Sequence, residues 1–132
     1  AALIGRRHDL GMRILVADDE PAIRLLYQLW LERGGNDVRV AGDGRDAIAL
    51  VDRRWIPDVA VLDLDMPLVD GLSVCRYLHS LDEDIRIVVV TGVEDRRSDA
   101  LAAGASEVLA KPVGREELVE ALLYLSGSLG VA

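Results

Sequence analysis

The sequence predicts an α/β protein: an open, doubly wound parallel sheet made of five strand–helix units, with helices on both faces. Five short aliphatic runs alternate along the chain with segments of helical periodicity. The strands are apolar on both sides, and such strands require helices over both faces of a parallel sheet. A length of 132 residues suits one domain, and 51% hydrophobic residues are sufficient for an aliphatic core.

The first two units span residues 13–55. The β-branched and leucine run RILVA, at residues 13–17, predicts the first strand. Pro21 opens a helix at the position where its missing N–H costs little, and Gly34 and Gly35 end that helix. Residues 37–41 predict the second strand and residues 44–55 the second helix. The inner face of the second helix is expected to carry Ala47, Ile48, Val51 and Trp55.

The remaining three units follow Pro57, which stops the preceding helix. Strands are predicted at residues 58–63, 86–91 and 107–110. A third helix is patterned by Leu72, Cys75 and Leu78, and Cys75 is expected in the core. A short alanine-rich helix closes at Gly104, and a last helix at residues 116–125 is expected to bury Leu118, Leu122 and Leu125.

Composition and the chain ends narrow the functional classes. A net charge of −8 argues against direct binding of nucleic acid or of an anionic membrane, and fits a protein that holds a cation or meets a basic partner. The single cysteine excludes an internal disulfide, and no apolar run reaches membrane-spanning length, so we expect a cytoplasmic protein. Residues 12–126 are expected to form the domain. Residues 1–11 are expected to be an N-terminal tail, with an artificial origin as one hypothesis, and residues 127–132 a C-terminal tail or the start of a linker.

Polar side chains collect where the predicted strands end. Right-handed crossovers and the strand order 2-1-3-4-5 give a flavodoxin-like sheet, whose crevice lies beyond the carboxyl ends of the first and third strands. Asp18 and Asp19 follow the first strand, and Asp63 ends the third. The next two strands end in Thr91 and in Lys111.

This set of residues predicts a metal-assisted phosphoryl site. Three carboxylates close together cannot all stay ionised without a compensating cation. An all-oxygen acidic cluster suits a hard divalent ion, and Mg²⁺ is the natural candidate. Asp63 is the best-placed nucleophile, because it ends the central strand and faces both the acidic pair and Lys111. The ion and the lysine would absorb the developing negative charge.

Four segments, ILVADDE, VLDLDMPLVDG, VVVTG and GASEVLAKP, resemble the receiver domain of bacterial two-component response regulators, in order and spacing. The resemblance runs from about Arg13 to Leu125. It implies that Asp63 accepts a phosphoryl group from a sensor histidine kinase or a histidine phosphotransfer protein, in a phosphorelay that controls an unknown output domain or effector. The domain is not expected to turn over a metabolite. It is expected only to accept the phosphoryl group and to lose it again by slow hydrolysis.

The resemblance also implies roles for single residues. Mg²⁺ would be held by Asp19, Asp63 and the backbone carbonyl of Asp65, and by Asp18 through water. Lys111 would pair with the phosphoryl group and precede a cis peptide bond to Pro112, and Thr91 would move to hydrogen-bond the phosphoryl oxygen.

Two residues depart from the family pattern or add to it. Val108 stands where the family usually has an aromatic ring that swings inward with the threonine, and a short β-branched side chain cannot sweep that volume. Asp65 is expected to direct its side chain at the site, and we hypothesise that this carboxylate alters the lifetime of the phosphoryl group by repelling or orienting water. Asp70 is interpreted as a helix cap rather than a metal ligand.

Three alternatives remain open on the sequence alone. A small phosphatase or dehalogenase also uses an aspartyl nucleophile, but needs a cap or insertions that these short loops lack. A flavodoxin-like cofactor binder needs a phosphate-cradling loop after the first strand, where this chain has DDEPA. A receiver-like domain that is never phosphorylated is kept open by Val108. Leu123 and Tyr124 are expected on the outer edge, and a dimer through the last helix and strand region is one hypothesis.

Overall fold

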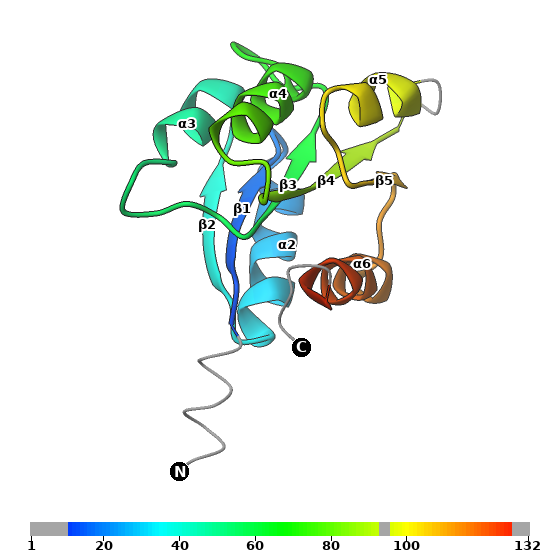
Figure 1. Cartoon of the computed structure of the whole chain (residues 1–132). Helices are drawn as coiled ribbons and strands as arrows, with labels where there is room; N and C mark the ends of the chain where they lie inside the picture. The colour runs from blue at the N-terminus through cyan, green and yellow to red at the C-terminus, as the bar shows by residue number, and fades with distance from the viewer. Residues whose placement is uncertain (1–10, 93–95, 128–132) are drawn as a thin grey trace.

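The computed structural model describes residues 11–92 and 96–127, which form a five-stranded parallel sheet in the order β2-β1-β3-β4-β5 (Figure 1). The strands are β1 (Arg13–Ala17), β2 (Asp37–Ala41), β3 (Val59–Asp63), β4 (Arg86–Thr91) and β5 (Glu107–Ala110). The helices are α2 (Pro21–Arg33), α3 (Gly44–Ala49), α4 (Gly71–Leu81), α5 (Arg97–Ala102) and α6 (Arg115–Gly127). The predicted fold class and strand order are therefore confirmed.

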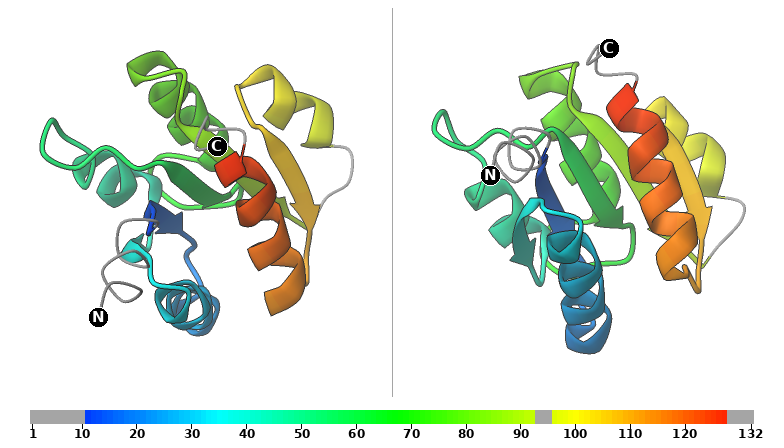
Figure 2. Two further views of the ribbon diagram at one scale, coloured as in Figure 1. Left: turned by 60° about the horizontal axis from the view of Figure 1, so that its bottom comes forward. Right: turned by 90° about the horizontal axis from the view of Figure 1, so that it is seen from below.

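The helices cover the sheet in two layers. Helices α3, α4 and α5 lie on one face, and α2 and α6 lie on the other, as the view from below also shows (Figures 1 and 2). Side chains of the central strands alternate between two cores because successive residues of a strand point to opposite faces. On β1, Leu15 belongs to the core under α3 and α4, whereas Ile14 and Val16 belong to the core under α2 and α6.

Strands β1, β2, β4 and β5 have the predicted bounds, and β3 begins one residue later than predicted. The inner faces of α4 and α6 are also as predicted. Leu72 is partly buried, and the fully buried residues are Cys75, Leu78, Leu118, Leu122 and Leu125. The expectation that all strands are apolar on both sides is wrong for the two edges. Strand β2 buries only Val38 and Ala41, and no residue of β5 is fully buried, because an edge strand has a neighbour on one side only.

The predicted helix at residues 44–55 is too long, since α3 ends at Ala49. Asp52 explains the difference. Its Oδ1 accepts hydrogen bonds from the backbone N–H groups of Arg54, at 2.8 Å, and of Trp55, at 3.1 Å, which holds a turn in place of helix. Val51 and Trp55 are nevertheless buried in the core, as expected of them as inner residues.

Two glycines let the β3–α4 connection lie close to its neighbours. A Cβ atom on Gly71 would fall 2.6 Å from Cα of Leu64 and still closer to the carbonyl oxygen of Asp63, so only glycine fits where α4 begins. A Cβ atom on Gly44 would overlap the backbone of Val69. Within the same connection, Leu68 has a left-handed φ of 70° and a side chain that is 67% exposed.

On the α2 face, Tyr27 is buried and its ring lies 5.7 Å from that of Trp30, tilted by 35°. On the opposite face, Trp55 donates from Nε1 to Asp37 Oδ2 at 3.1 Å, and the Arg39 guanidinium lies 4.5 Å from the centre of its indole. Residues 1–10 of the predicted N-terminal tail and residues 128–132 of the predicted C-terminal tail lie outside the described residues. Gly127, predicted as the first residue of the C-terminal tail, is the last residue of α6.

Candidate functional site

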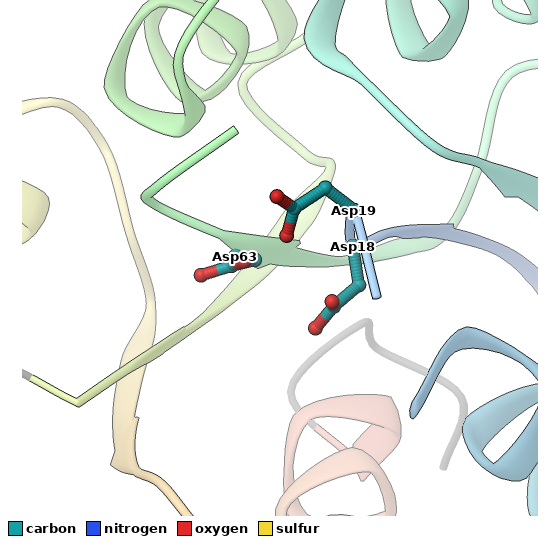
Figure 3. Close-up of side chains that lie close together, drawn as sticks. All are labelled: Asp18, Asp19 and Asp63. Carbon is teal, nitrogen blue, oxygen red and sulfur yellow. The ribbon is translucent and has the colours of Figure 1, made fainter. Parts of the chain in front are cut away.

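Three carboxylates meet at the carboxyl ends of β1 and β3, as predicted. Asp18 and Asp19 follow β1, Asp63 is the last residue of β3, and one oxygen of each lies within 4.8 Å of the others (Figure 3). Asp18 is 1% exposed and Asp63 3% exposed, while Asp19 is exposed. The site therefore has a buried floor and one carboxylate open to solvent.

Asp18 is held at three points. Its backbone N–H donates to the carbonyl of Ala41 at 3.1 Å, and its backbone carbonyl accepts from Arg24 Nη1 at 2.8 Å. Its side-chain Oδ1 accepts from the N–H of Glu20 at 2.9 Å. Its other oxygen, Oδ2, is buried without a hydrogen-bond partner and lies 3.8 Å from the Lys111 ammonium.

Lys111 brings a cation to the same crevice from the end of β5. Its Nζ lies 3.2 Å from Asp63 Oδ1, the oxygen that also accepts from the N–H of Asp65 at 3.3 Å. The peptide bond from Lys111 to Pro112 is cis, as the family resemblance implied. The five residues of the predicted strand-end set thus reach one rim of the sheet, with Thr91 buried at the end of β4.

The electrostatics of the site are those of crowded carboxylates. Burial raises the pKa of the Asp63 carboxyl above its ordinary value, and the Asp18 charge adds to the rise, although the Lys111 ammonium opposes it. Burial likewise raises the pKa of Asp18, against the hydrogen bond from Glu20. Burial by itself lowers the pKa of Lys111, but Asp18 and Asp63 outweigh this effect and the net change is upward.

These residues fit a hard divalent cation. All the side-chain ligands are carboxylate oxygens, which suit Mg²⁺. The buried Oδ2 of Asp18 has no hydrogen-bond donor, and an ion or its bound water would supply the missing partner. Lys111 alone does not neutralise the cluster, because the pKa values of Asp18 and Asp63 remain raised beside it. A cation at this position would lower both.

Asp65 does not join the three clustered carboxylates through its side chain. That side chain is 63% exposed, and its Oδ1 lies 3.5 Å from Nη1 of Arg96, the residue before α5. The expectation that the Asp65 carboxylate faces the site is therefore wrong: the carboxylate is exposed to solvent and lies beside Arg96. Arg96 also lies 3.8 Å from Asp99, measured from Nε to Oδ2.

Two further predictions about single residues, those for Asp70 and Cys75, are confirmed. Asp70 is the N-cap of α4, where its Oδ1 accepts from the N–H of Ser73 at 2.8 Å. Cys75 is buried, burial raises its thiol pKa to about 11, and it has the character of a core residue. Val108 is partly buried on β5 and packs against the core on the α3–α5 side.

The sequence prediction missed Arg24 and Arg96. Both read as ordinary surface arginines on helical segments, because neither has a motif of its own. The available signal for Arg24 was its place in the first turn of the helix that leaves the Asp18–Asp19 loop. For Arg96 no comparable signal exists, since its contact with Asp65 depends on the packing of two separate loops.

Comparison with known proteins gives one family. Residues 14–123 match the family described as the response regulator receiver domain. The chain is 44% identical over 114 residues to the response regulator MprA of Mycolicibacterium vanbaalenii, which covers 83% of this chain and 48% of that protein. The corresponding protein of Mycobacterium leprae is 43% identical over 110 residues, with 82% and 48% covered. The chain thus spans about half the length of the curated relatives it matches.

Solved structures agree on the fold. A CheY-like receiver domain protein from Methanospirillum hungatei matches with a TM-score of 0.85 at 25% identity, over 91% of this chain and 97% of that one. The receiver domain of the Francisella response regulator 1452 matches with a TM-score of 0.82 at 28% identity, over 89% and 98% of the two chains.

Proposed function

Since the chain belongs to the response regulator receiver family of two-component systems, we propose that Asp63 is the residue that accepts the phosphoryl group. The observation that carries this proposal is the position of Asp63 at the end of the central strand, 3.2 Å from Lys111 and beside Asp18 and Asp19. The domain is a signalling module rather than a metabolic enzyme.

In the proposed reaction, a carboxylate oxygen of Asp63 attacks the phosphorus of a phosphohistidine on the partner. The P–O bond forms as the P–N bond breaks, and the electron pair of that bond returns to the imidazole nitrogen. Lys111 stabilises the negative charge on the phosphoryl oxygens, and Thr91, buried at the end of the neighbouring strand, hydrogen-bonds one of them. Slow attack of water on the phosphorus of the acyl phosphate then breaks the P–O bond to Asp63, releases inorganic phosphate and restores the carboxylate.

Asp18, Asp19 and Asp63 would hold Mg²⁺, together with the backbone carbonyl of Asp65. The ion would supply positive charge opposite the phosphoryl oxygens. The residues of the chain do the rest: β1 and β3 fix the carboxylates, and the hydrogen bonds to Asp18 limit its movement.

The partners are a sensor histidine kinase or a histidine phosphotransfer protein as phosphoryl donor, and an output domain or effector that reads the phosphorylated state. Leu123 and Tyr124 on α6 are 63% and 76% exposed, which supports the outer-edge position predicted for them. A dimer through α6 and β5 stays a prediction, as does the cytoplasmic location. Among the described residues, no helix is long and apolar enough to cross a membrane.

The test is phosphorylation by acetyl phosphate, followed by intact-protein mass. We expect a gain of one phosphoryl group that requires Mg²⁺, is abolished by EDTA, and is absent in Asp63→Asn. Asp70→Asn is the matched control: it removes a nearby carboxylate but keeps a residue that caps α4 equally well. A domain that gains no phosphoryl group, or an Asp63→Asn variant that still gains one, would contradict the proposal. A negative result with the wild-type chain would favour the receiver-like domain that is never phosphorylated.

A further inference from the structure

Arg24 connects the acidic site to the rest of the domain through a hydrogen bond to the main chain. Its Nη1 donates to the backbone carbonyl of Asp18 at 2.8 Å, in a partly buried position. Arg24 lies in the first turn of α2, and its own N–H donates to the carbonyl of Glu20 at 2.9 Å. The guanidinium and the backbone N–H of Arg24 therefore both bond to the short loop between β1 and α2.

The bond from Arg24 acts on the peptide unit that joins the two acidic residues. The carbonyl of Asp18 belongs to the same planar group as the N–H of Asp19, so fixing this oxygen fixes the direction in which the chain enters Asp19. The Asp19 side chain is exposed, whereas that of Asp18 is buried. Its direction therefore depends on its backbone more than does that of buried Asp18.

The segment after β2 leaves space for this arrangement. A Cβ atom on Gly42 would lie 3.0 Å from Nη1 and 3.5 Å from Cζ of Arg24. The residue before it, Ala41, accepts the hydrogen bond from the N–H of Asp18. Two neighbouring residues at the end of β2 thus support the acidic loop, one by accepting a hydrogen bond and one by lacking a side chain.

Charge alone does not account for Arg24. Within the part of the chain that the structure describes, Arg24 forms no ion pair with a carboxylate, and its guanidinium donates to a backbone carbonyl instead. A guanidinium close to a cation site would weaken cation binding by repulsion. A positioning role and a charge role therefore predict opposite signs when the charge is removed.

We propose that Arg24 is a positioning residue for the Asp18–Asp19 pair, holding the connecting peptide so that both carboxylates face Asp63 and bind a divalent cation. The proposal rests on the metal site of the proposed function. Gly42 is the companion of Arg24, because it provides the space in which the guanidinium lies.

The test measures the dissociation constant of Mn²⁺ from the free-ion signal in electron paramagnetic resonance, with Mg²⁺ as competitor. We expect Arg24→Gln to weaken Mn²⁺ binding about 3- to 10-fold, the size of the effect of one ordinary hydrogen bond. Arg33→Gln, with the same change in charge at the other end of α2, should change the constant less than about 2-fold, because the site is far from it. Arg24→Gln binding as tight as wild type, or tighter, would overturn the proposal in favour of a charge role.

Gly42→Ala provides a second variant that keeps Arg24. Its methyl group should push the guanidinium away by a few tenths of an ångström and weaken Mn²⁺ binding in the same direction as Arg24→Gln, but less. If Arg24→Gln does not fold, wild-type affinity in Gly42→Ala overturns the proposal. Asp19→Asn tests the metal site separately from the role of Arg24. If neither wild type nor Asp19→Asn binds Mn²⁺, the proposed metal site is wrong. If only Asp19→Asn loses Mn²⁺ binding, the metal site is established and the Arg24 variants test the positioning role.

Discussion

Lys111 Nζ lies 3.2 Å from Asp63 Oδ1, yet Lys111 does not suppress the unfavourable electrostatics of that carboxylate. Asp63 is 3% exposed and faces a second buried carboxylate, so its pKa stays raised despite the ammonium. The pair thus differs from an ordinary stabilising ion pair, because burial of the acidic partner costs more than the attraction returns.

Asp63→Asn is therefore expected to stabilise the metal-free domain at pH 7.5, by about 1 kcal/mol. A carboxyl whose pKa is higher in the folded than in the unfolded protein costs stability while it is ionised. The cost is complete above the folded pKa and disappears as pH falls toward the ordinary value of 3.8. The gain in stability of the variant should accordingly shrink toward pH 4.5.

Urea unfolding in EDTA at pH 7.5 and pH 4.5 measures the difference in free energy of unfolding between Asp63→Asn and wild type. A wild type that is the more stable at pH 7.5 would refute the expectation. Asp43→Asn, which keeps the cap of α3, should stay within about 0.5 kcal/mol.

Asp65→Asn is expected to lengthen the lifetime of the phosphorylated state, about 3-fold or more. Although the Asp65 carboxylate does not join the acidic cluster, it is exposed to solvent two residues from the acceptor, so a water that approaches from solvent can be oriented by it. The decay of the phosphorylated mass after removal of acetyl phosphate measures the rate. Asp70→Asn serves again as the control, and equal decay rates for wild type and Asp65→Asn would exclude a role for this side chain.

Gly71→Ala is expected to lower the free energy of unfolding by about 2 kcal/mol or more, since a methyl group there meets the backbone of Asp63 and Leu64. The same substitution should reduce phosphorylation, because the contact lies on the acceptor residue. Gly114→Ala is the matched control. Gly71 is the first residue of α4 and Gly114 directly precedes α6, but a Cβ atom on Gly114 would have no neighbour within 4 Å. Similar stabilities for the two variants would show that the backbone can move aside at no cost.

Leu68→Asn is expected to raise the free energy of unfolding by about 0.5–1 kcal/mol. Leu68 has a left-handed φ of 70° and is 67% exposed, so it pays for strain while burying little. Asparagine tolerates this conformation better than leucine does. Urea unfolding checks the gain, and Leu81→Asn, a substitution at a 45% exposed leucine in the last turn of α4, should give no gain.

The sheet and most of the site could be predicted because their signals are local and mutually consistent. Every residue of β4 after Arg86 is β-branched, and each strand of the site ends at its polar residue or one residue before it. The second helix was overextended because the periodicity of Val51 and Trp55 continues past Ala49. There the side chain of Asp52 bonds to the backbone, a competition that hydrophobic spacing does not register.

The contacts of long side chains were the part that the sequence could not supply. Arg24 reaches the carbonyl of Asp18, and Arg96 reaches Asp65, through flexible side chains that have several rotatable bonds. Which acceptor such a side chain meets depends on how loops pack in three dimensions. The direction of the Asp65 carboxylate was predicted wrongly for the same reason.

The ring contact between Tyr27 and Trp30 gives the domain an optical reporter of its own. Burial raises the pKa of Tyr27, and the charges of Asp18 and Asp63 act on it too, so the phenol is coupled to the acidic crevice. Trp55 lies on the other face of the sheet, with Arg39 over its ring. Its Nε1 donates to Asp37, the first residue of β2, whereas the acidic crevice lies beyond the last residues of the strands. We therefore expect the fluorescence of Trp30 to respond when the crevice is occupied, and the fluorescence of Trp55 to serve as an internal reference.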